Sequence, residues 1–404
     1  MLWPHRSYAW GLAALEVDRF APQANTVPVS DDLIVFAEDW GGHPSSTQHL
    51  VRHLAATRRV IWVNSMGMRR PRLSAYDARR AASKLTLGLR ETIAREMPSS
   101  ASNPLVVNPL AVPMPGNPIA ERLNRELVRR VVHKHMQRLG VQSPILWLSV
   151  PTAVRMSGLF GERALVYYCG DDFGSMKDVD DSVVGPTEQE LVERADLVLA
   201  ASAALAETFP QGKTHLVPHG VDYELFTKAA PPPGDLPRGV PVVGFYGSIA
   251  DWLDLDLLDG VFRALPSYKF VFIGPRKIST ERLASHANVT ILGERPHEAL
   301  PPYSQNWDVS ILPFKDNPQI RACNPLKLRE YLAAGRPIVS TDFSSLDGYR
   351  DLVEVAGTVD EFASAIVESR NRHDPDRAAE RRARVEPESW NARATQVDEL
   401  LRQV

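Results

Sequence analysis

The stretch "CNPLKLREYLAAGRPIVST", residues 323–341, combines one helix with one strand and decides the class of fold. Asn324 is a favourable helix N-cap, and Pro325 suits the first helical position. Gly335 is typical of the residue that follows a helix, and "RPIVST" after it has the β-branched character of a short strand. The stretch therefore predicts one helix–strand step of an α/β fold.

The same alternation extends through most of the chain. Apolar runs of strand length alternate with segments of helical periodicity. These runs occur at 32–39, 59–65, 144–150, 164–170, 196–202, 214–220, 242–248, 269–275, 288–294 and 308–314. Apolar strands that alternate with helices are typical of parallel sheets covered by helices on both faces. The pattern predicts the α/β class with doubly wound, Rossmann-like sheets.

A proline-rich segment divides this pattern into two halves. Residues 228–241, "KAAPPPGDLPRGVP", suit neither a helix nor a strand, and 404 residues exceed what one core usually holds. We predict two Rossmann-like domains that face a cleft, the first over 1–218 and the second over 219–387. The C-terminal helix, about 388–404, is expected to pack back on the first domain.

The composition is that of an ordinary globular protein, with 44% hydrophobic residues and a net charge of −3, so nothing indicates a nucleic-acid partner. Two cysteines, Cys169 and Cys323, provide neither a disulfide framework nor the spacing of a metal site. The first twenty residues have only a broken apolar stretch, unlike a signal peptide or a spanning helix. These features predict a cytoplasmic protein.

The charge is nevertheless uneven along the chain. Residues 58–138 contain 16 Lys or Arg but only 5 Asp or Glu. Within this region the segment 69–96 has helical periodicity, with Arg79, Arg80 and Lys84 on one sector and apolar residues on the other. One interpretation is a core-facing helix with a solvated basic back. The other is a surface helix that contacts anionic lipid on the inner membrane face, or a phosphate-bearing acceptor.

Lys327 is unusual because it puts a cation into the first turn of a helix, where the helix dipole favours an anion. In doubly wound folds, ligands bind at the carboxyl ends of the strands, which is where this helix begins. A phosphate there would be held by Lys327 and the helix N-terminus together, with Arg321 as a second contact. Glu330, one turn later, would accept ribose hydroxyls. The alternative is an ordinary surface Lys–Glu pair at i,i+3.

Several segments resemble the group 1, family 4-like glycosyltransferases of the GT-B fold. The matching pieces are "VPHGVDYELF", "VVGFYGSIADWLDLDLL", "KFVFIGP", "NVTILGERPHEALPPYSQNWDVSILPF" and "NPLKLREYLAAGRPIVS". In the first half, "EDWGGHPSSTQHLVRHLA", "RVIWVNS" and "YYCGDDFGS" are similar to the bacterial teichuronic-acid and exopolysaccharide type, and to xanthan glucuronosyltransferase. The resemblance implies transfer of a sugar from a nucleoside diphosphate, with uridine expected, to a glycan or lipid-linked glycan acceptor. It also implies that no metal or cofactor is needed.

On the donor side, the resemblance carries over only in part. Glu330 matches the second glutamate of the family's E-x7-E motif, but Ala322 stands at the first, which leaves the retaining or inverting outcome open. The usual cations after the first donor-domain strand are also missing from "GSIADWLD". Gly247 and Ser248 would then offer backbone and hydroxyl donors. The expected donor-binding set is Lys327, Glu330, Arg321, Gly247, Ser248, Glu294, Arg295 and Asn324.

On the acceptor side, the first domain should provide the base that activates the acceptor hydroxyl. Asp171 and Asp172 follow a predicted strand in "YYCGDDF", and the resemblance to the glucuronosyltransferase favours one of them. Their structural alternative is to cap the next turn. His43 is the other candidate, because Gly41 and Gly42 would let the backbone approach a ligand.

Two other functions fit the same fold. A sugar-nucleotide 2-epimerase would convert a UDP-sugar without any acceptor. A degenerate module would bind a nucleotide-sugar without turnover, which the missing cations and Ala322 make conceivable.

Overall fold

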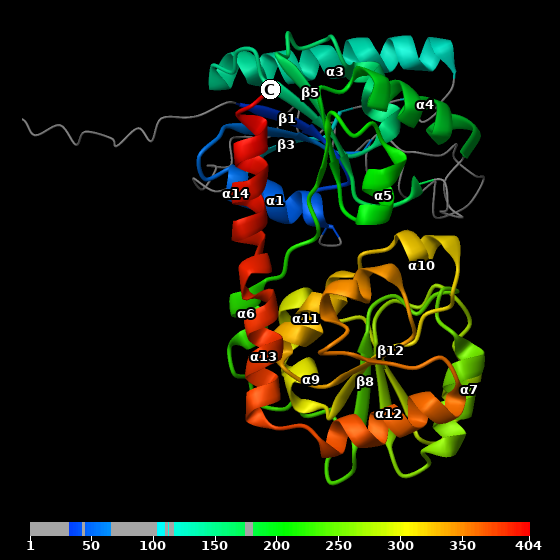
Figure 1. The fold of residues 1–404 in the computed structure, drawn as a ribbon. Helices are drawn as coiled ribbons and strands as arrows, with labels where there is room; N and C mark the ends of the chain where they lie inside the picture. The colour runs from blue at the N-terminus through cyan, green and yellow to red at the C-terminus, as the bar shows by residue number, and fades with distance from the viewer. Residues whose placement is uncertain (1–31, 43–44, 66–102, 110–111, 113–116, 174–180) are drawn as a thin grey trace, which may run out of the picture.

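The computed structural model describes residues 32–42, 45–65, 103–109, 112, 117–173 and 181–404 (Figure 1). His43 and the basic segment 69–96 therefore lie outside the described residues. In the described part of the chain, no helix is both long enough and apolar enough to span a bilayer. The predicted fold class is confirmed, because the chain forms two parallel sheets flanked by helices.

The described residues of the first domain form a seven-stranded sheet in the order β3-β2-β1-β4-β5-β6-β7, in which every pair is parallel. The strands are β1 (Leu33–Phe36), β2 (Val60–Val63), β3 (Leu105–Val107), β4 (Ile145–Leu148), β5 (Ala164–Cys169), β6 (Leu197–Ala200) and β7 (Thr214–Leu216). The helices are α1 (Ser46–Leu54), α3 (Pro118–Leu139), η1 (Pro151–Met156), α4 (Asp181–Arg194) and α5 (Ala203–Thr208).

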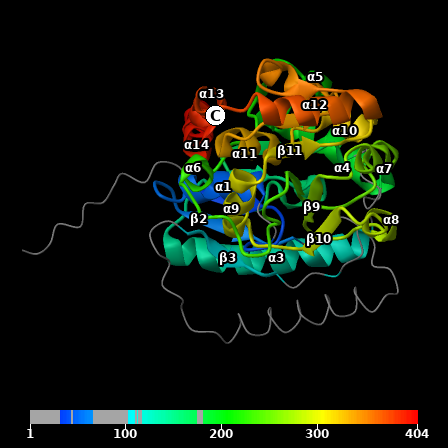
Figure 2. The same ribbon diagram turned by 90° about the horizontal axis from the view of Figure 1, so that it is seen from below.

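Strand β1 shows why its residues are almost all apolar. Ile34 and Phe36 belong to the core that includes residues of α3 and α4, whereas Leu33 and Val35 belong to the core beneath α1. Successive strand residues point to opposite faces, so a sheet covered on both sides needs a continuous apolar run. In the view from below, α3 extends along the width of this domain (Figure 2).

The described residues of the second domain form a six-stranded parallel sheet in the order β10-β9-β8-β11-β12-β13. The strands are β8 (Val242–Tyr246), β9 (Lys269–Ile273), β10 (Val289–Gly293), β11 (Val309–Leu312), β12 (Ile338–Ser340) and β13 (Glu354–Val355). The helices are α6 (Tyr223–Thr227), α7 (Leu255–Ala264), α8 (Glu281–Ala284), η3 (His297–Ala299), α9 (Pro301–Asn306), α10 (Pro318–Ala322), α11 (Leu326–Ala334), η4 (Ser344–Tyr349) and α12 (Val359–Asn371).

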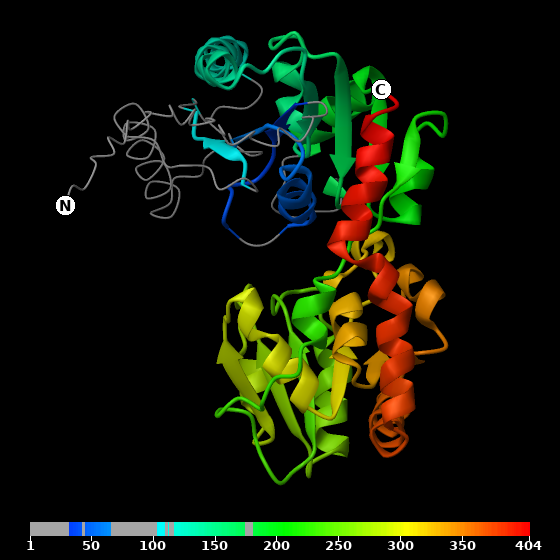
Figure 3. The same ribbon diagram turned by 90° about the vertical axis from the view of Figure 1, so that its left-hand side faces the viewer.

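The chain crosses between the domains twice, and the two crossings lie side by side. After α13 (Pro375–Val385) and η5 (Glu386–Glu388), helix α14 (Trp390–Leu401) returns to the first domain, where it packs on α1 (Figures 1 and 3). Val221 donates its N–H to Glu388 O at 3.0 Å, and Trp390 donates to Val221 O at 3.1 Å. These bonds make the connection a two-stranded hinge rather than a single flexible linker.

Candidate functional site

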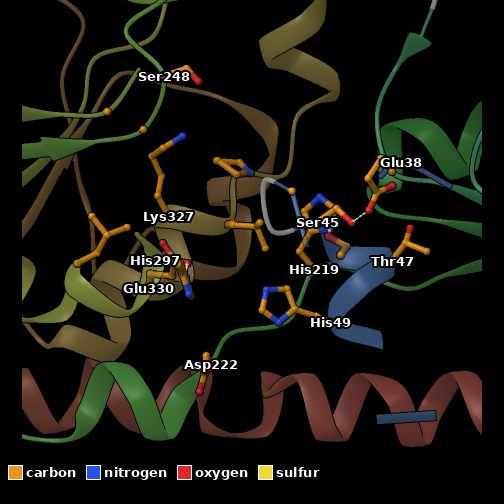
Figure 4. Close-up of a pocket in the computed structure, with 18 of the residues that line it drawn as sticks. Glu38, Ser45, Thr47, His49, His219, Asp222, Ser248, His297, Lys327 and Glu330 are labelled. Carbon is orange, nitrogen blue, oxygen red and sulfur yellow. Dashed lines mark hydrogen bonds and ion pairs between the residues drawn. The ribbon is translucent and has the colours of Figure 1, made fainter. Parts of the chain in front are cut away.

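A cleft of about 860 Å³ separates the carboxyl edges of the two sheets (Figure 4). The first domain contributes the ends of β1, β4 and β5 and the start of α1; the second contributes the ends of β8 and β9, the loop after β10 and the start of α11. Its volume suits a ligand of nucleotide-sugar size. Both domains therefore supply side chains to one ligand-sized space, at the edge where doubly wound folds bind ligands.

Lys327 extends into this cleft from the first turn of α11. Its ammonium lies 5.7 Å from the Phe245 ring and 5.4 Å from the Phe314 ring, and no carboxylate of the described chain forms an ion pair with it. Burial lowers the pKa of Lys327, although Cys323 and Glu330 oppose that shift. A half-buried cation without a counter-ion is a favourable position for an anionic ligand, because the ligand would supply the missing charge.

Two glycines let Lys327 lie across the ends of β8 and β9. Gly247 has φ +130°, and a Cβ there would come within 2.7 Å of Lys327 Cε. Gly274 has φ +144°, and its Cβ would meet Gly247 O at 2.1 Å. Both positions require glycine for conformation and for space. Next to the ammonium the cleft is therefore lined by backbone without side chains, which a ligand can approach closely.

The prediction that Asn324 caps α11 was wrong. Pro325 is the N-cap residue, with φ −69° and ψ 124°, and no side chain caps this helix. Asn324 is buried instead, where its Nδ2 donates to Ala201 O of the first domain at 2.7 Å and its Oδ1 accepts from Arg329 Nη1 at 2.5 Å. Because Asn324 bonds across the interface, the first N–H groups of α11 stay uncapped at the cleft wall.

Glu330 lies one turn beyond Lys327 and is bonded to a residue that sequence reasoning missed. His297 Nε2 lies 2.7 Å from Glu330 Oε1, and both residues line the cleft. Burial lowers the pKa of His297, but the hydrogen bond and charge of Glu330 outweigh it, so the net pKa is raised. His297 belongs to the segment "GERPHEAL", whose predicted donor contacts are Glu294 and Arg295.

The other predicted donor residues fall into two groups. Ser248, Glu294 and Arg295 line the cleft, although Arg295 also pairs with Asp235 at 3.1 Å. Arg321 is not among the lining residues; its exposed guanidinium pairs with Asp316 at 2.6 Å. The structure therefore brings together the predicted set except for Arg321, which α10 carries to the surface.

On the first-domain wall, Asp171 lines the cleft and Asp172 does not. Asp171 is exposed to solvent, although protein atoms of the cleft surround its carboxyl group. This partial loss of hydration, followed by the charge of Asp172, raises the pKa of Asp171 to about 6. A carboxylate with such a pKa is mostly ionised at neutral pH and still basic enough to take a proton. Gly41 and Gly42 also line this wall.

The first-domain wall also includes Glu38, which was not predicted. Glu38 follows β1, and its Oε1 accepts hydrogen bonds from Ser45 Oγ and, at 3.1 Å, from Gln48 Nε2 (Figure 4). Ser45 in turn caps α1 by accepting from Gln48 N at 3.2 Å. An acidic residue directly after a strand, at the same sheet edge as Asp171, is the signal that could have identified it.

A buried polar network joins the second-domain wall to the hinge. Arg329, on α11, donates to Glu388 Oε2 at 2.7 Å, and Glu388 Oε1 accepts from the Tyr349 hydroxyl at 2.6 Å. The Arg329 side chain is only 5% exposed. Together with the Asn324 bond to Ala201, this network fixes the start of α11 relative to both crossings and to the first domain.

Comparisons with known proteins agree with this geometry. Residues 240–371 match the sequence model of the family described as "Glycosyl transferases group 1". The chain is 30% identical over 221 residues to TuaH of Bacillus subtilis (strain 168), which is named as a glycosyltransferase of teichuronic acid biosynthesis. That match covers 50% of this chain and 56% of the relative, so the chain spans about half the length of the curated protein it matches.

Two solved structures show the same fold over almost the whole chain. Sucrose-phosphate synthase from Thermosynechococcus elongatus has a TM-score of 0.65 at 18% identity, and covers 93% of this chain and 99% of its own. HepE from Anabaena in complex with UDP-glucose has a TM-score of 0.64 at 13% identity, and covers 93% and 100%. At these identities the likeness establishes the fold alone. The chain therefore carries a group 1 glycosyltransferase domain at residues 240–371 and has the GT-B fold as a whole.

Proposed function

We propose that this protein is a glycosyltransferase that moves a sugar from a nucleoside diphosphate, UDP above all, to a glycan or lipid-linked glycan acceptor in cell-surface polysaccharide synthesis. The observation that carries the proposal is the half-buried Lys327 ammonium, which has no carboxylate partner in the described chain and lies beside an uncapped helix N-terminus. The relative named for teichuronic acid biosynthesis and the UDP-glucose complex of the similar fold support it.

The donor would lie on the second-domain wall. Its diphosphate would pair with Lys327 and accept hydrogen bonds from the first N–H groups of α11. Gly247 and Gly274 leave room for the diphosphate to approach the backbone. Glu330 would accept the ribose hydroxyls, and the base would lie against the loop that includes Glu294 and Arg295.

The acceptor would meet the first-domain wall, where we assign Asp171 as the residue that receives or orients the proton of the attacking hydroxyl. As that oxygen bonds to the anomeric carbon, the bond from this carbon to the terminal phosphate oxygen breaks, and the diphosphate leaves against Lys327. Closure about the hinge would exclude the water that otherwise hydrolyses the donor. We propose that this reaction needs no metal, so a chelator should leave turnover unchanged.

Product analysis tests the proposal directly. The purified chain is incubated with a panel of UDP-, GDP- and dTDP-sugars, each with and without a polyprenyl-diphosphate-linked saccharide acceptor, and the products are identified by mass spectrometry. Acceptor-dependent release of the nucleoside diphosphate with a lengthened glycan supports the proposal. Conversion of the donor without an acceptor would identify the 2-epimerase alternative, and tight donor binding without any product would indicate a non-catalytic module.

We also propose that the protein acts at the cytoplasmic face of the membrane, with the basic segment 69–96 as the contact to anionic lipid. Replacing Arg79, Arg80 and Lys84 with glutamine should release the protein from vesicles that contain phosphatidylglycerol. Unchanged co-flotation with those vesicles would contradict this part of the proposal.

A further inference from the structure

We infer that His297 is a positioning residue for the nucleotide donor: its hydrogen bond holds the Glu330 carboxylate in the orientation that meets the ribose, so that the site selects ribonucleotides. The inference rests on the proposed function, because it assumes that the donor ribose lies at Glu330. It goes further by assigning the preference for ribose over deoxyribose to a histidine in the loop after β10 as well as to the carboxylate.

The acid to which His297 is hydrogen-bonded is Glu330. The 2.7 Å bond joins the imidazole Nε2 to one carboxylate oxygen, Oε1. Both side chains are largely enclosed, with 17% of the His297 side chain and 9% of the Glu330 side chain exposed. A carboxylate has roughly four acceptor positions, so the bond from His297 leaves others for ligand hydroxyls. The buried Tyr246 hydroxyl of β8 also interacts with Glu330.

The surroundings of His297 favour its charged form. Asp222, at the hinge before α6, and Glu298, on its own loop, act in the same direction as Glu330 and raise its pKa, against the opposing effect of burial. The Phe226 ring contributes no charge at 5.4 Å. His297 therefore carries a proton to a higher pH than an ordinary histidine does.

From the first domain, the side chain that faces the His297 ring is His49, which is neutral. His49, on α1, has its ring centroid 6.0 Å from that of His297 and stacks on Trp390 at 4.6 Å with an interplanar angle of 2°. Burial, followed by the charges of His297, Arg52 and His53, lowers the pKa of His49 to about 3. His49 thus stays neutral, and His297 is the cation of this pair.

The chemical consequence follows from the orientation of the Glu330 carboxylate. Without the hydrogen bond from His297, the Glu330 carboxylate would be free to rotate away from a bound ligand. Held in place by His297, the carboxylate can accept from two neighbouring hydroxyls, such as the 2′- and 3′-hydroxyls of ribose. A 2′-deoxynucleotide offers one donor fewer. We expect it to bind about 10- to 100-fold more weakly, as for the loss of one hydrogen bond to a charged group.

The experiment is calorimetric titration of the full chain with UDP-glucose and with its 2′-deoxy analogue, from about pH 6 to about pH 9. UDP-glucose is suitable because its diphosphate is esterified at both ends and does not titrate over that range, unlike free UDP. The variants are His297→Gln, which stays neutral but keeps an N–H donor, and His215→Gln as the control. His215 is an exposed histidine on β7, away from the cleft.

In the wild type and in His215→Gln, we expect ribose preference and an affinity that is full below the raised pKa of His297 and falls as the pH rises through it. In His297→Gln, UDP-glucose should bind about tenfold more weakly, with the ribose preference reduced to about threefold or less and a flat pH profile. Melting temperatures distinguish a folded variant from a misfolded one. Glu330→Gln, which removes the other partner, should show the same flat profile.

The outcomes separate the two levels of the proposal. If His297→Gln keeps the affinity, the ribose preference and the pH profile of the wild type, the role of His297 is wrong while the donor site stands. If the wild type binds UDP-glucose but does not prefer it to the deoxy analogue, the selectivity is wrong in the same way. If the wild type does not bind UDP-glucose at all, the proposed donor site fails and this inference fails with it.

Discussion

The two walls of the cleft differ in the groups that would face the phosphates of a donor and the hydroxyl of an acceptor. The second-domain wall presents the Lys327 ammonium over bare glycine backbone, whereas the first-domain wall presents the carboxyl groups of Asp171 and Glu38 with a serine and a glutamine around them. A cation over bare backbone suits a bound anion, and carboxylates suit a hydroxyl that must lose a proton. The contrast explains how one fold, used twice in one chain, can provide two halves of a group transfer.

The largest expected effect comes from removing the proposed base, Asp171, on the first-domain wall. Asp171→Asn should lower kcat by about 100- to 10,000-fold, the usual range for a positioned general base, with little change in donor affinity. In the wild type, the rate should rise with pH through about 6 and then level off, because the raised pKa of Asp171 keeps it protonated below that point. Steady-state kinetics with a saturating acceptor would measure both.

Asp172→Asn is the matched control, because Asp172 is adjacent but does not line the cleft. If this variant loses as much activity as Asp171→Asn, or more, the proposal that Asp171 is the base is wrong.

The next largest effect should come from the network of Arg329, Glu388 and Tyr349, which fixes helix α11 to the hinge. Glu388→Ala leaves Arg329 buried without its carboxylate partner and should cost about 3 kcal/mol of unfolding free energy, the lower end for a broken buried pair, because 17% of the Glu388 side chain is exposed. Urea denaturation would measure this loss. Asp342→Ala, which removes a partner of exposed Arg350, should change stability little.

The stability difference between the wild type and Glu388→Ala should also depend on pH. Burial opposes the ionisation of Glu388, but Arg329, Tyr349 and Arg393 outweigh it and lower its pKa. The pair therefore contributes fully above the ordinary glutamate pKa and loses its contribution as the pH falls below it. Wild type and Glu388→Ala should converge in stability on acidification, and a constant difference between them down to low pH would contradict the assignment.

A smaller effect is expected from Gly247, one of the two glycines that line the second-domain wall next to Lys327. Gly247→Ala would press a Cβ against Lys327 Cε and should weaken UDP binding about tenfold by displacing the ammonium. Gly239→Ala is the control, since Gly239 also has a positive φ, +76°, but has nothing within 4 Å of its Cβ position. Equal loss of UDP affinity in the two variants would mean that strain, not the displacement of Lys327, is responsible.

The smallest effect is predicted for Arg321, which the sequence had suggested as a second phosphate contact. Its guanidinium is bonded to Asp316 on the surface, so Arg321→Ala should change UDP affinity by less than about twofold. A loss comparable to that of a direct phosphate contact in calorimetry would show that Arg321 moves into the cleft when the donor binds.

These two walls were not equally predictable from the sequence. The strands could be predicted because buried parallel strands need continuous apolar runs, and Lys327 stood out as a cation in the first turn of a helix. Asn324 was misassigned because a local capping preference lost to Ala201 O, which lies 123 residues earlier in the chain. His297 was missed because its partner Glu330 is 33 residues away and no local pattern indicates the pair.

Titration of UDP into the wild type and into Lys327→Met tests the proposed donor site on the second-domain wall most directly. Methionine keeps an unbranched side chain against Phe245 and Phe314 while removing the charge, so a change in affinity reports the phosphate contact itself. The predicted result is binding of UDP by the wild type and a 10- to 150-fold weaker affinity in the variant, or about 1.5–3 kcal/mol. Equal binding by the two proteins, or no binding by the wild type, would contradict the account.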